Sequence, residues 1–365
     1  MKWQWKLGRF AGIDVFVHAT FLLLIGWVGY TYWREFQDWS RVFIGILFIL
    51  ALFLCVVLHE YGHALTARKY GIKTRDITLY PIGGVARLER LPDRPIEELW
   101  VALAGPAVNV VIAALLIAYL FLTNSLTPIT EMNFTQGSFV ERLVATNIYL
   151  VLFNLIPAFP MDGGRVLRAL LALKLEYVQA TQIAATIGQG IALLFGFIGL
   201  FTNSFLIFIA LFVWIGAGQE ASMVQVRHSL GGIPITRAMQ TDFQVLSPSD
   251  TLARVVELIL AGSQQDFPVV ENGRVVGILD RDTFISALSK NGQNTSVAEV
   301  MHRNVPEIDS HDMVEKALTL LQESGSKTLP VRHGDRLVGL ITAENITEFL
   351  MIRSALRTAG GVTGI

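Results

Sequence analysis

The chain has 365 residues, of which 52% are hydrophobic and 16% charged, and its mean hydropathy is +0.50. Soluble globular proteins carry about 25% charged residues, so this composition excludes an ordinary soluble enzyme. The net charge of −1 gives no indication of a nucleic-acid partner. The apolar excess fills about the first 220 residues and is absent afterwards. The sequence therefore predicts a membrane domain followed by a soluble domain.

Apolar stretches of the length needed for a membrane-spanning helix, roughly 20 residues, recur through this first part. They lie at about 18–33, 42–65, 99–123, 139–157, 181–202 and 204–220, which predicts six spans.

Basic residues orient these spans. Lys and Arg gather near the N-terminus, in 66–98 and after residue 162, whereas 124–138 contains neither. The positive-inside rule places the basic segments in the cytoplasm. An even number of spans then puts both termini on the cytoplasmic side of the cell membrane.

The second predicted span ends near H-E-Y-G-H, residues 59–63. On a helix His59 and His63 lie on one face and can bind one zinc ion, with Glu60 beside them as a general base. The alternative is a pair of histidines satisfied by hydrogen bonds between helices. Ionisable groups inside a span are costly and usually functional, which favours the metal site. His59 precedes Arg68 by about 14 Å along a helix, which places it below the cytoplasmic surface.

A catalytic zinc site needs a third protein ligand. Asp162 is the candidate, because a carboxylate at the end of an apolar stretch needs a partner and a metal supplies one. Its alternative role is a helix N-cap. Asn154 either hydrogen-bonds a substrate carbonyl or oxyanion, or holds helices together. His18 opens the first span and is interpreted as an interfacial residue rather than an oxyanion donor.

Together these residues resemble the site-2 protease family of intramembrane zinc metalloproteases. The resemblance covers about residues 1–220. Its motifs are H-E-Y-G-H, N-x-x-P-x-x-P-x-D-G (154–163), A-L-A-G-P-A-V-N (102–109) and P-I-G-G-V-A (81–86). It implies one zinc ion per chain, a catalytic base, a residue that positions the substrate and three zinc ligands: Glu60 as the base, Asn154 for positioning, and His59, His63 and Asp162 as the ligands.

The family cleaves transmembrane segments of other proteins, for example anti-sigma factors or remnant signal peptides. The resemblance therefore implies a zinc metalloendopeptidase that acts on membrane-protein substrates within the lipid bilayer. The stretch 76–88 alternates weakly and contains a Gly pair. It predicts a hairpin that either dips into the membrane and pairs with an unwound substrate strand, or lies in the cytoplasm as an ordinary hairpin. The small residues Ala104–Ala107 are interpreted as close helix packing.

The second part of the chain contains an internal repeat. Residues 267–283 match 329–345 at a constant offset of 62, and each unit predicts helix, strand, strand, helix. The pair resembles tandem CBS domains, at 234–290 and 295–354. This resemblance implies an adenine nucleotide in the cleft between the repeats and a homodimer formed through the pair. The alternative is a purely structural dimerisation tail.

The CBS family usually binds ribose through a Thr or Ser followed three residues later by Asp. The second repeat has Thr342 and Asn345, whereas the first has Asp280 and Thr283. We therefore take Asp280 and Thr342 as the candidate nucleotide contacts, with a pattern that departs from the usual one.

The predicted fold is a polytopic α-helical membrane domain at 1–222, with about six spans and a small membrane-associated β element, followed by a soluble α+β tandem CBS module. The predicted function is intramembrane proteolysis, regulated through the CBS pair. One alternative, a CBS-regulated channel or transporter, leaves the His, Glu and Asp residues above without a shared purpose. The other, a catalytically inactive membrane-binding homologue, is disfavoured by the intact Glu60.

Overall fold

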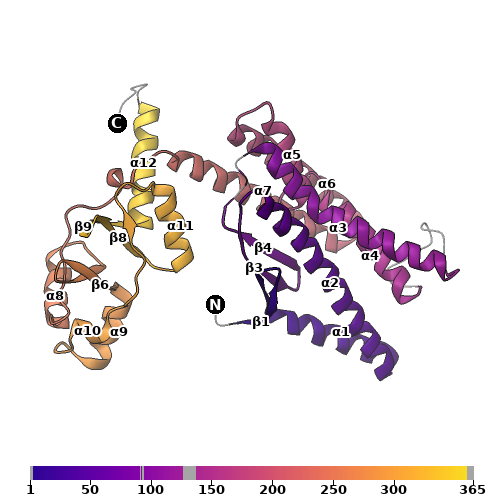
Figure 1. The fold of residues 1–365 in the computed structure, drawn as a ribbon, viewed down its shortest axis with the longest axis horizontal. Coiled ribbons are helices and arrows are strands. Elements are labelled where there is room, and N and C mark those ends of the chain that lie inside the picture. Colours follow the sequence, from indigo (N-terminus) through magenta and orange to yellow (C-terminus); the bar gives the residue numbers. More distant parts are fainter. Residues whose placement is uncertain (1–2, 91, 93, 126–136, 360–365) are drawn as a thin grey trace. The chain divides into compact units, whose positions relative to one another are not determined.

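The computed structural model describes residues 3–90, 92, 94–125 and 137–359 (Figure 1). The chain divides into two compact units, Met1–Val224 and Gln225–Ile365, which we describe separately. Most of the predicted loop at 124–138 lies outside the described residues.

The first unit is mainly helical. Its helices are α1 (Thr20–Phe36), α2 (Trp39–Lys69), α3 (Pro95–Leu122), α4 (Phe139–Asn154), α5 (Asp162–Ala172), α6 (Tyr177–Phe201) and α7 (Ser204–Leu230), the last of which crosses the unit boundary. Among the described helices, α2, α3, α6 and α7 are long and apolar enough to cross a membrane. Helices α1 and α4 cover two further predicted spans but have 17 and 16 residues, slightly fewer than the roughly 20 that a span needs. The chain is a multi-pass membrane protein.

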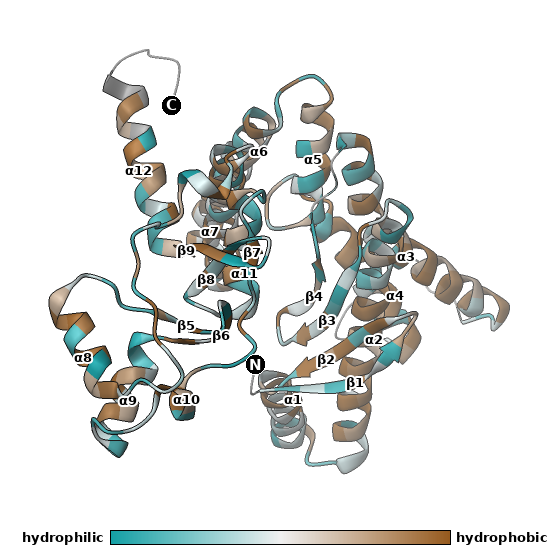
Figure 2. Cartoon of the chain, turned by 60° about the vertical axis from the view of Figure 1, so that its left-hand side comes forward, coloured by the Kyte–Doolittle hydropathy of each residue, from teal (hydrophilic) through white to brown (hydrophobic). Residues whose placement is uncertain are grey.

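Local signals define where these helices begin. The Asp38 side chain accepts the backbone N–H of Ser40 at the start of α2, and Ser138 and Glu141 form a capping box at the start of α4. Figure 2 shows apolar residues along much of α2, α3 and α6. Many large apolar side chains of α6 and α7 remain exposed, Phe197, Phe201 and Phe208 among them. Such outward apolar faces suit contact with lipid.

A small sheet lies against α2. Its strands are β1 (Gln4–Phe10), β2 (Ile13–His18), β3 (Thr74–Tyr80) and β4 (Gly83–Leu88), in the order β1-β2-β3-β4. The predicted hairpin at 76–88 is confirmed as the antiparallel pair β3–β4, whereas the hairpin β1–β2 was not predicted. Strands β2 and β3 run parallel, because α1 and α2 connect them.

Two helices of the first unit approach closely beside the sheet. A Cβ at Gly62 of α2 would lie 2.6 Å from the carbonyl oxygen of Ala104 in α3. Only glycine permits this approach. Gly62 in H-E-Y-G-H therefore lets α2 pack directly against the backbone of α3.

The second unit contains two similar halves. The first has α8 (Leu252–Ala261), β5 (Phe267–Glu271), β6 (Arg274–Leu279) and α9 (Arg281–Asn291); the second has α11 (Val314–Ser324), β8 (Thr328–His333), β9 (Arg336–Thr342) and α12 (Ala343–Ala359). The remaining short elements are the 3₁₀ turn η2 (Ile235–Arg237), α10 (Val297–Val300) and β7 (Ile308–Asp309). The predicted order of helix, strand, strand, helix is confirmed in both halves.

The two halves exchange backbone segments. Gln240, which precedes α8, pairs with Leu340 of β9, and His302, which follows α10, pairs with Ile278 of β6. Each half thus completes the sheet of the other, which explains why the two repeats fold as one unit.

Candidate metal centre

Three side chains converge between α2 and α5. The Nε2 atoms of His59 and His63 lie 3.1 Å apart, and each lies 3.2 Å from Oδ2 of Asp162. All three side chains are buried, and in the described part of the chain they form the one group of this kind suited to hold a metal ion. One turn of α2 supplies both histidines and the first residue of α5 supplies the carboxylate.

The local sequence explains how Asp162 reaches this position. Helix α5 begins after Met161, so Asp162 is its first helical residue and not its N-cap. A Cβ at Gly163 would lie 2.2 Å from the carbonyl oxygen of Ile156, and one at Gly164 would lie 2.6 Å from the backbone nitrogen of Phe159. The D-G-G sequence therefore allows the preceding loop to fold back on the start of the helix and aim the carboxylate at the histidines.

Space for an ion depends on Gly105 of α3. A Cβ at this position would lie 2.2 Å from Nε2 of His63 and 2.6 Å from Nε2 of His59. Because Gly105 has no side chain, the space between the ligand atoms stays open. The interpretation of Ala104–Ala107 as helix packing was incomplete, since Gly105 also borders the centre. Two imidazole nitrogens, one carboxylate oxygen and this space fit a catalytic zinc ion.

Hydrogen bonds orient both histidines toward this space. Nδ1 of His63 lies 2.7 Å from the carbonyl oxygen of Val101, which can only accept a hydrogen bond. Nδ1 of His63 therefore carries the proton and Nε2 keeps its lone pair. Nδ1 of His59 lies 2.5 Å from Oδ1 of Asn109, and Asn109 contacts Asn147 of α4. Neither asparagine was among the predicted site residues.

Glu60 lies beside the ligands and against β4. Its Oε2 accepts the backbone N–H of Ala86 at 3.1 Å, and a Cβ at Gly84 would lie 2.8 Å from Cγ of Glu60. Ala86 is opposite Ile77 in the hairpin, one pair from Thr78–Val85 and three pairs from Tyr80–Gly83, which is the pair next to the turn. Its N–H points away from β3, because hydrogen-bonded and open pairs alternate along an antiparallel ladder. The free edge of β4 therefore faces Glu60.

Two other predicted site residues lie outside this cluster. Asn154 is the last residue of α4, half-buried, and among the described residues it makes no hydrogen bond to either histidine or to Asp162. His18 ends β2, where its Nδ1 lies 2.8 Å from Oγ1 of Thr20 and its ring stacks on Tyr80.

A buried ionic network holds the other end of α5. Nε and Nη2 of Arg168 lie 2.8 and 2.5 Å from Oε1 of Glu98 in α3, and Nη1 lies 2.6 Å from Oε1 of Glu220 in α7. Arg168 is completely buried. This network was not predicted, although Glu98 and Glu220, each within an apolar helix, were a signal for it.

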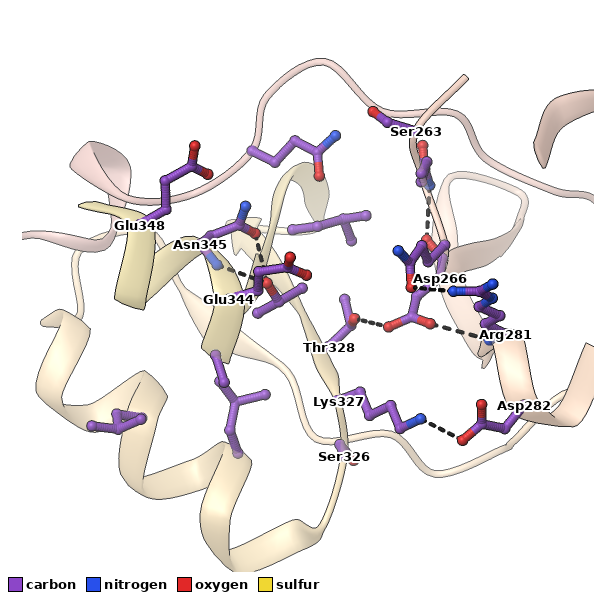
Figure 3. Close-up of a pocket in the computed structure, with 18 of the residues that line it drawn as sticks. Ser263, Asp266, Arg281, Asp282, Ser326, Lys327, Thr328, Glu344, Asn345 and Glu348 are labelled. Atoms are coloured by element: carbon purple, nitrogen blue, oxygen red, sulfur yellow. Dashed lines mark hydrogen bonds and ion pairs between the residues drawn. The ribbon is translucent and has the colours of Figure 1, made fainter. Parts of the chain in front are cut away.

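The candidate nucleotide contacts lie in two different cavities of the second unit. Thr342 lines the larger one, of about 1160 Å³, and Asp280 lines a neighbouring one of about 440 Å³. Figure 3 shows the larger cavity, where the two halves contact each other: Thr328 donates to Asp266, and Lys327 pairs with Asp282.

Both candidates already have partners within the chain. Oγ1 of Thr342 donates to Oδ1 of Asn345 at 2.9 Å. Asp280 accepts the backbone N–H and the hydroxyl of Thr283, and lies 2.9 Å from Nε2 of His302. Burial raises the pKa of Asp280. The hydrogen bonds from Thr283 and the nearby His302 lower it by more than burial raises it, so the pKa lies below the usual range.

The fold and the donor set define a membrane metalloprotease, and comparison with known proteins agrees. Residues 47–142 and 126–195 match the family described as Peptidase family M50, and residues 232–290 and 297–352 match the CBS domain. A zinc metalloprotease of Methanocaldococcus jannaschii is 33% identical over 96% of this chain and 97% of its own length. The chain belongs to peptidase family M50, the site-2 protease family, and carries a tandem pair of CBS domains.

Two further similarities involve parts of the chain. The solved structure of the site-2 protease from Methanocaldococcus jannaschii is 38% identical, with a TM-score of 0.45, and the match covers 60% of this chain and 95% of that one. A CBS domain-containing protein of Bacillus subtilis is 30% identical over 28% of this chain and 75% of its own length. The family membership and the donor set together make the protein a zinc metalloprotease of the site-2 type, with a metal site formed by His59, His63 and Asp162.

Proposed function

We propose that the chain is an endopeptidase that hydrolyses peptide bonds in or near transmembrane segments of other membrane proteins, such as anti-sigma factors or remnant signal peptides. The observation that carries the proposal is the buried group of His59, His63 and Asp162 within helices of a multi-pass membrane protein, beside a carboxylate and a free strand edge. A channel or transporter would have no use for this combination.

The ligands in this proposal are His59, His63 and Asp162, with one zinc ion per chain. When bound, zinc lowers the pKa of water and polarises a carbonyl group. Glu60 is the general base. Because Ala86 donates to its Oε2, Oε1 is the oxygen free to take a proton from the attacking water and to pass it to the departing amine. Asn154 positions the substrate from the end of α4.

A transmembrane substrate must unwind before its peptide bonds are accessible. We propose that the unwound segment adds as a strand to the free edge of β4, since this edge faces Glu60 and offers unpaired backbone groups. Main-chain hydrogen bonds along this edge would hold the segment extended beside the base.

The experiment that tests this function is cleavage of a transmembrane substrate by Glu60→Gln in detergent or lipid, together with zinc analysis. We expect a loss of about 10²–10⁴-fold in cleavage rate with zinc content unchanged. The matched control is Glu89→Gln, which changes an exposed carboxylate one residue after β4. Cleavage by Glu60→Gln at the parent rate would exclude the proposed mechanism, and no cleavage by the parent protein would favour an inactive homologue.

The topology in this proposal has six spans, with α1 and α4 as the two short ones, and both termini in the cytoplasm. The membrane domain covers 1–222 and the CBS repeats cover 234–290 and 295–354. Labelling of single cysteines placed in the basic segment after Lys69 and at the C-terminal end tests the orientation. Both positions should react from the cytoplasmic side, and reaction from opposite sides would contradict the topology.

For the second unit we propose regulation of cleavage by an adenine nucleotide in the cavity between the repeats, and a homodimer through the CBS pair. The size of the larger cavity supports a nucleotide, and Asp280 and Thr342 are its proposed contacts from neighbouring cavities. Equilibrium binding of AMP and ATP to the full chain, to Asp280→Asn and to Thr342→Val tests the ligand. Light scattering in detergent tests the dimer.

A further inference from the structure

A chain of hydrogen bonds connects a zinc ligand to a helix that carries no ligand. Nδ2 of Asn147 donates to the carbonyl oxygen of Leu143, one turn earlier in α4, at 2.9 Å. Nδ2 of Asn109, in α3, donates to Oδ1 of Asn147 at 2.8 Å, and Oδ1 of Asn109 lies 2.5 Å from Nδ1 of His59. Both asparagines are completely buried.

The donor and acceptor order of these hydrogen bonds follows from the Leu143 carbonyl oxygen, where they end. A backbone carbonyl oxygen can only accept, so the Asn147 amide must turn its NH₂ group toward Leu143 and its oxygen toward Asn109. That oxygen requires the NH₂ group of Asn109, which leaves the Asn109 oxygen facing the histidine. An amide oxygen also only accepts, so Nδ1 of His59 must carry the proton.

The opposite arrangement would place acceptors against each other. If Nδ1 of His59 lacked its proton, Asn109 would have to turn over, then Asn147 would follow, and the Asn147 oxygen would meet the Leu143 oxygen. No water replaces the lost bonds, because these groups are buried within the helices. The carbonyl oxygen of Leu143 thus selects one tautomer of a residue on another helix.

We propose that Asn109 and Asn147 are positioning residues that fix His59 as the Nδ1-protonated tautomer, so that its Nε2 lone pair is free for the metal. His63 obtains the same tautomer directly from the Val101 carbonyl. His59 has no backbone carbonyl in this position and receives its orientation through the two amides. The inference rests on the proposed zinc site and adds to it the residues that set its affinity.

The test measures zinc affinity of the full chain in detergent, by competition with a chelator, together with the visible spectrum of the Co²⁺-substituted protein. We expect Asn109→Leu to bind zinc about 10–100-fold more weakly and to shift the Co²⁺ bands, the range typical of a lost partner of a metal-bound histidine. Asn109→Asp keeps an acceptor for Nδ1 of His59 whichever way the carboxylate turns, but its second oxygen then faces Oδ1 of Asn147. As a single variant it should therefore bind zinc more tightly than Asn109→Leu and more weakly than the parent.

The second amide gives a sharper test. Asn147→Leu should also weaken zinc binding, because Asn109 is then free to turn over. Asn109→Asp added to Asn147→Leu should restore the affinity, because the carboxylate has no wrong orientation. A general loss of packing predicts the reverse, with the double variant weaker than either single one. This comparison decides the question even if Asn109→Leu fails to fold.

The matched control is Thr146→Val, next to Asn147 in α4. Thr146 is buried, and its hydroxyl donates to the carbonyl oxygen of Arg142 in its own helix. Its zinc affinity and Co²⁺ spectrum should equal those of the parent. Parent-like zinc binding by Asn109→Leu, or a double variant Asn109→Asp with Asn147→Leu that binds zinc no more tightly than Asn147→Leu alone, would overturn the inference. Cleavage is not part of this test, so a failure of the proposed protease function would leave its result unchanged.

Discussion

The two units of the chain differ in how deeply their paired polar side chains are buried. Several buried polar side chains of the first unit each have defined partners on another helix. They are the three metal ligands, the positioning residues Asn109 and Asn147, and Arg168. In the second unit the ion pairs lie largely at the surface: the side chains of Arg274 and Asp335 pair at 3.1 Å while 76% and 77% exposed. Water can replace a partner in the second unit but not among the membrane helices.

This difference predicts how well each unit tolerates the loss of a polar partner. A change at His59 or Asp162 would leave other buried groups without partners, at a cost that lipid cannot offset. In the CBS pair, Asp280 and Thr283 stand in the reverse of the usual order, yet they still hydrogen-bond each other. The comparison predicts large effects for small changes in the first unit and small effects for charge changes in the second.

The largest effect should come from one methyl group at the metal centre. Gly105→Ala would place Cβ 2.2 Å from Nε2 of His63, where it occupies the space that the ion needs. We expect zinc binding and cleavage to be lost together, which zinc analysis of the purified protein and a cleavage assay would show. The matched control is Gly190→Ala in α6, where a Cβ meets nothing within 4 Å. Full zinc occupancy in Gly105→Ala would place the metal elsewhere.

The second effect contrasts a buried with an exposed arginine. Arg168→Ala leaves Glu98 buried without its partner, and breaking a buried pair in this way costs about 3–5 kcal/mol. Arg274→Ala breaks the exposed pair with Asp335, where we expect a cost below about 1 kcal/mol. Unfolding of the detergent-solubilised protein should show the first change, and hydrogen exchange of the β5–β6 region should show the second. Equal costs would remove the distinction between the two units.

A double variant without either buried charge shows whether charge or packing causes the cost of Arg168→Ala. Arg168→Met combined with Glu98→Gln removes both buried charges and retains much of the volume. We expect it to be more stable than Arg168→Ala alone, because no charge is left unpaired. A double variant less stable than the single one would mean that packing of Arg168 on Phe159 and Tyr177, rather than the charge, dominates.

The same contrast separates what the sequence could and could not predict. His59, His63 and Glu60 follow from spacing within one helix, and the CBS repeats follow from a constant offset. Asp162 followed from the chemical need for a third ligand. The roles of Gly105, Asn109 and Asn147 were not predictable, because the rotation of α3 and α4 about their axes decides which side chains face the histidines.

Two other differences are local. The hairpin β1–β2 was missed because its segment was interpreted only through its basic residues, which orient the spans. Its signal was the alternation on either side of Ala11 and Gly12, both of which adopt positive φ in the turn. Asp280 and Thr342 occupy equivalent repeat positions but line different cavities, and the two cavities share Asp266, Lys327 and Thr328 among their lining residues.

The smallest effect is a pH dependence in the second unit. The pKa of Asp280 in the folded protein lies below its usual range, so its contribution to stability is present above the unfolded pKa of about 3.9 and disappears as the pH falls through the folded pKa. Asp280 is partly solvated, so we expect Asp280→Asn to cost less than about 1 kcal/mol at pH 7. Below about pH 4 the difference from the parent should shrink.

Hydrogen exchange of the segment that begins α9, compared between parent and variant at pH 7, at pH 4 and below pH 4, measures this difference. Thr283→Val keeps the carboxylate and removes the hydroxyl donor, so its effect should be smaller than that of Asp280→Asn and should follow the same pH trend. A difference that grows as the pH falls would mean that the carboxylate is held protonated in the folded protein. The weak electrostatic constraint assigned to the second unit would then be wrong at this position.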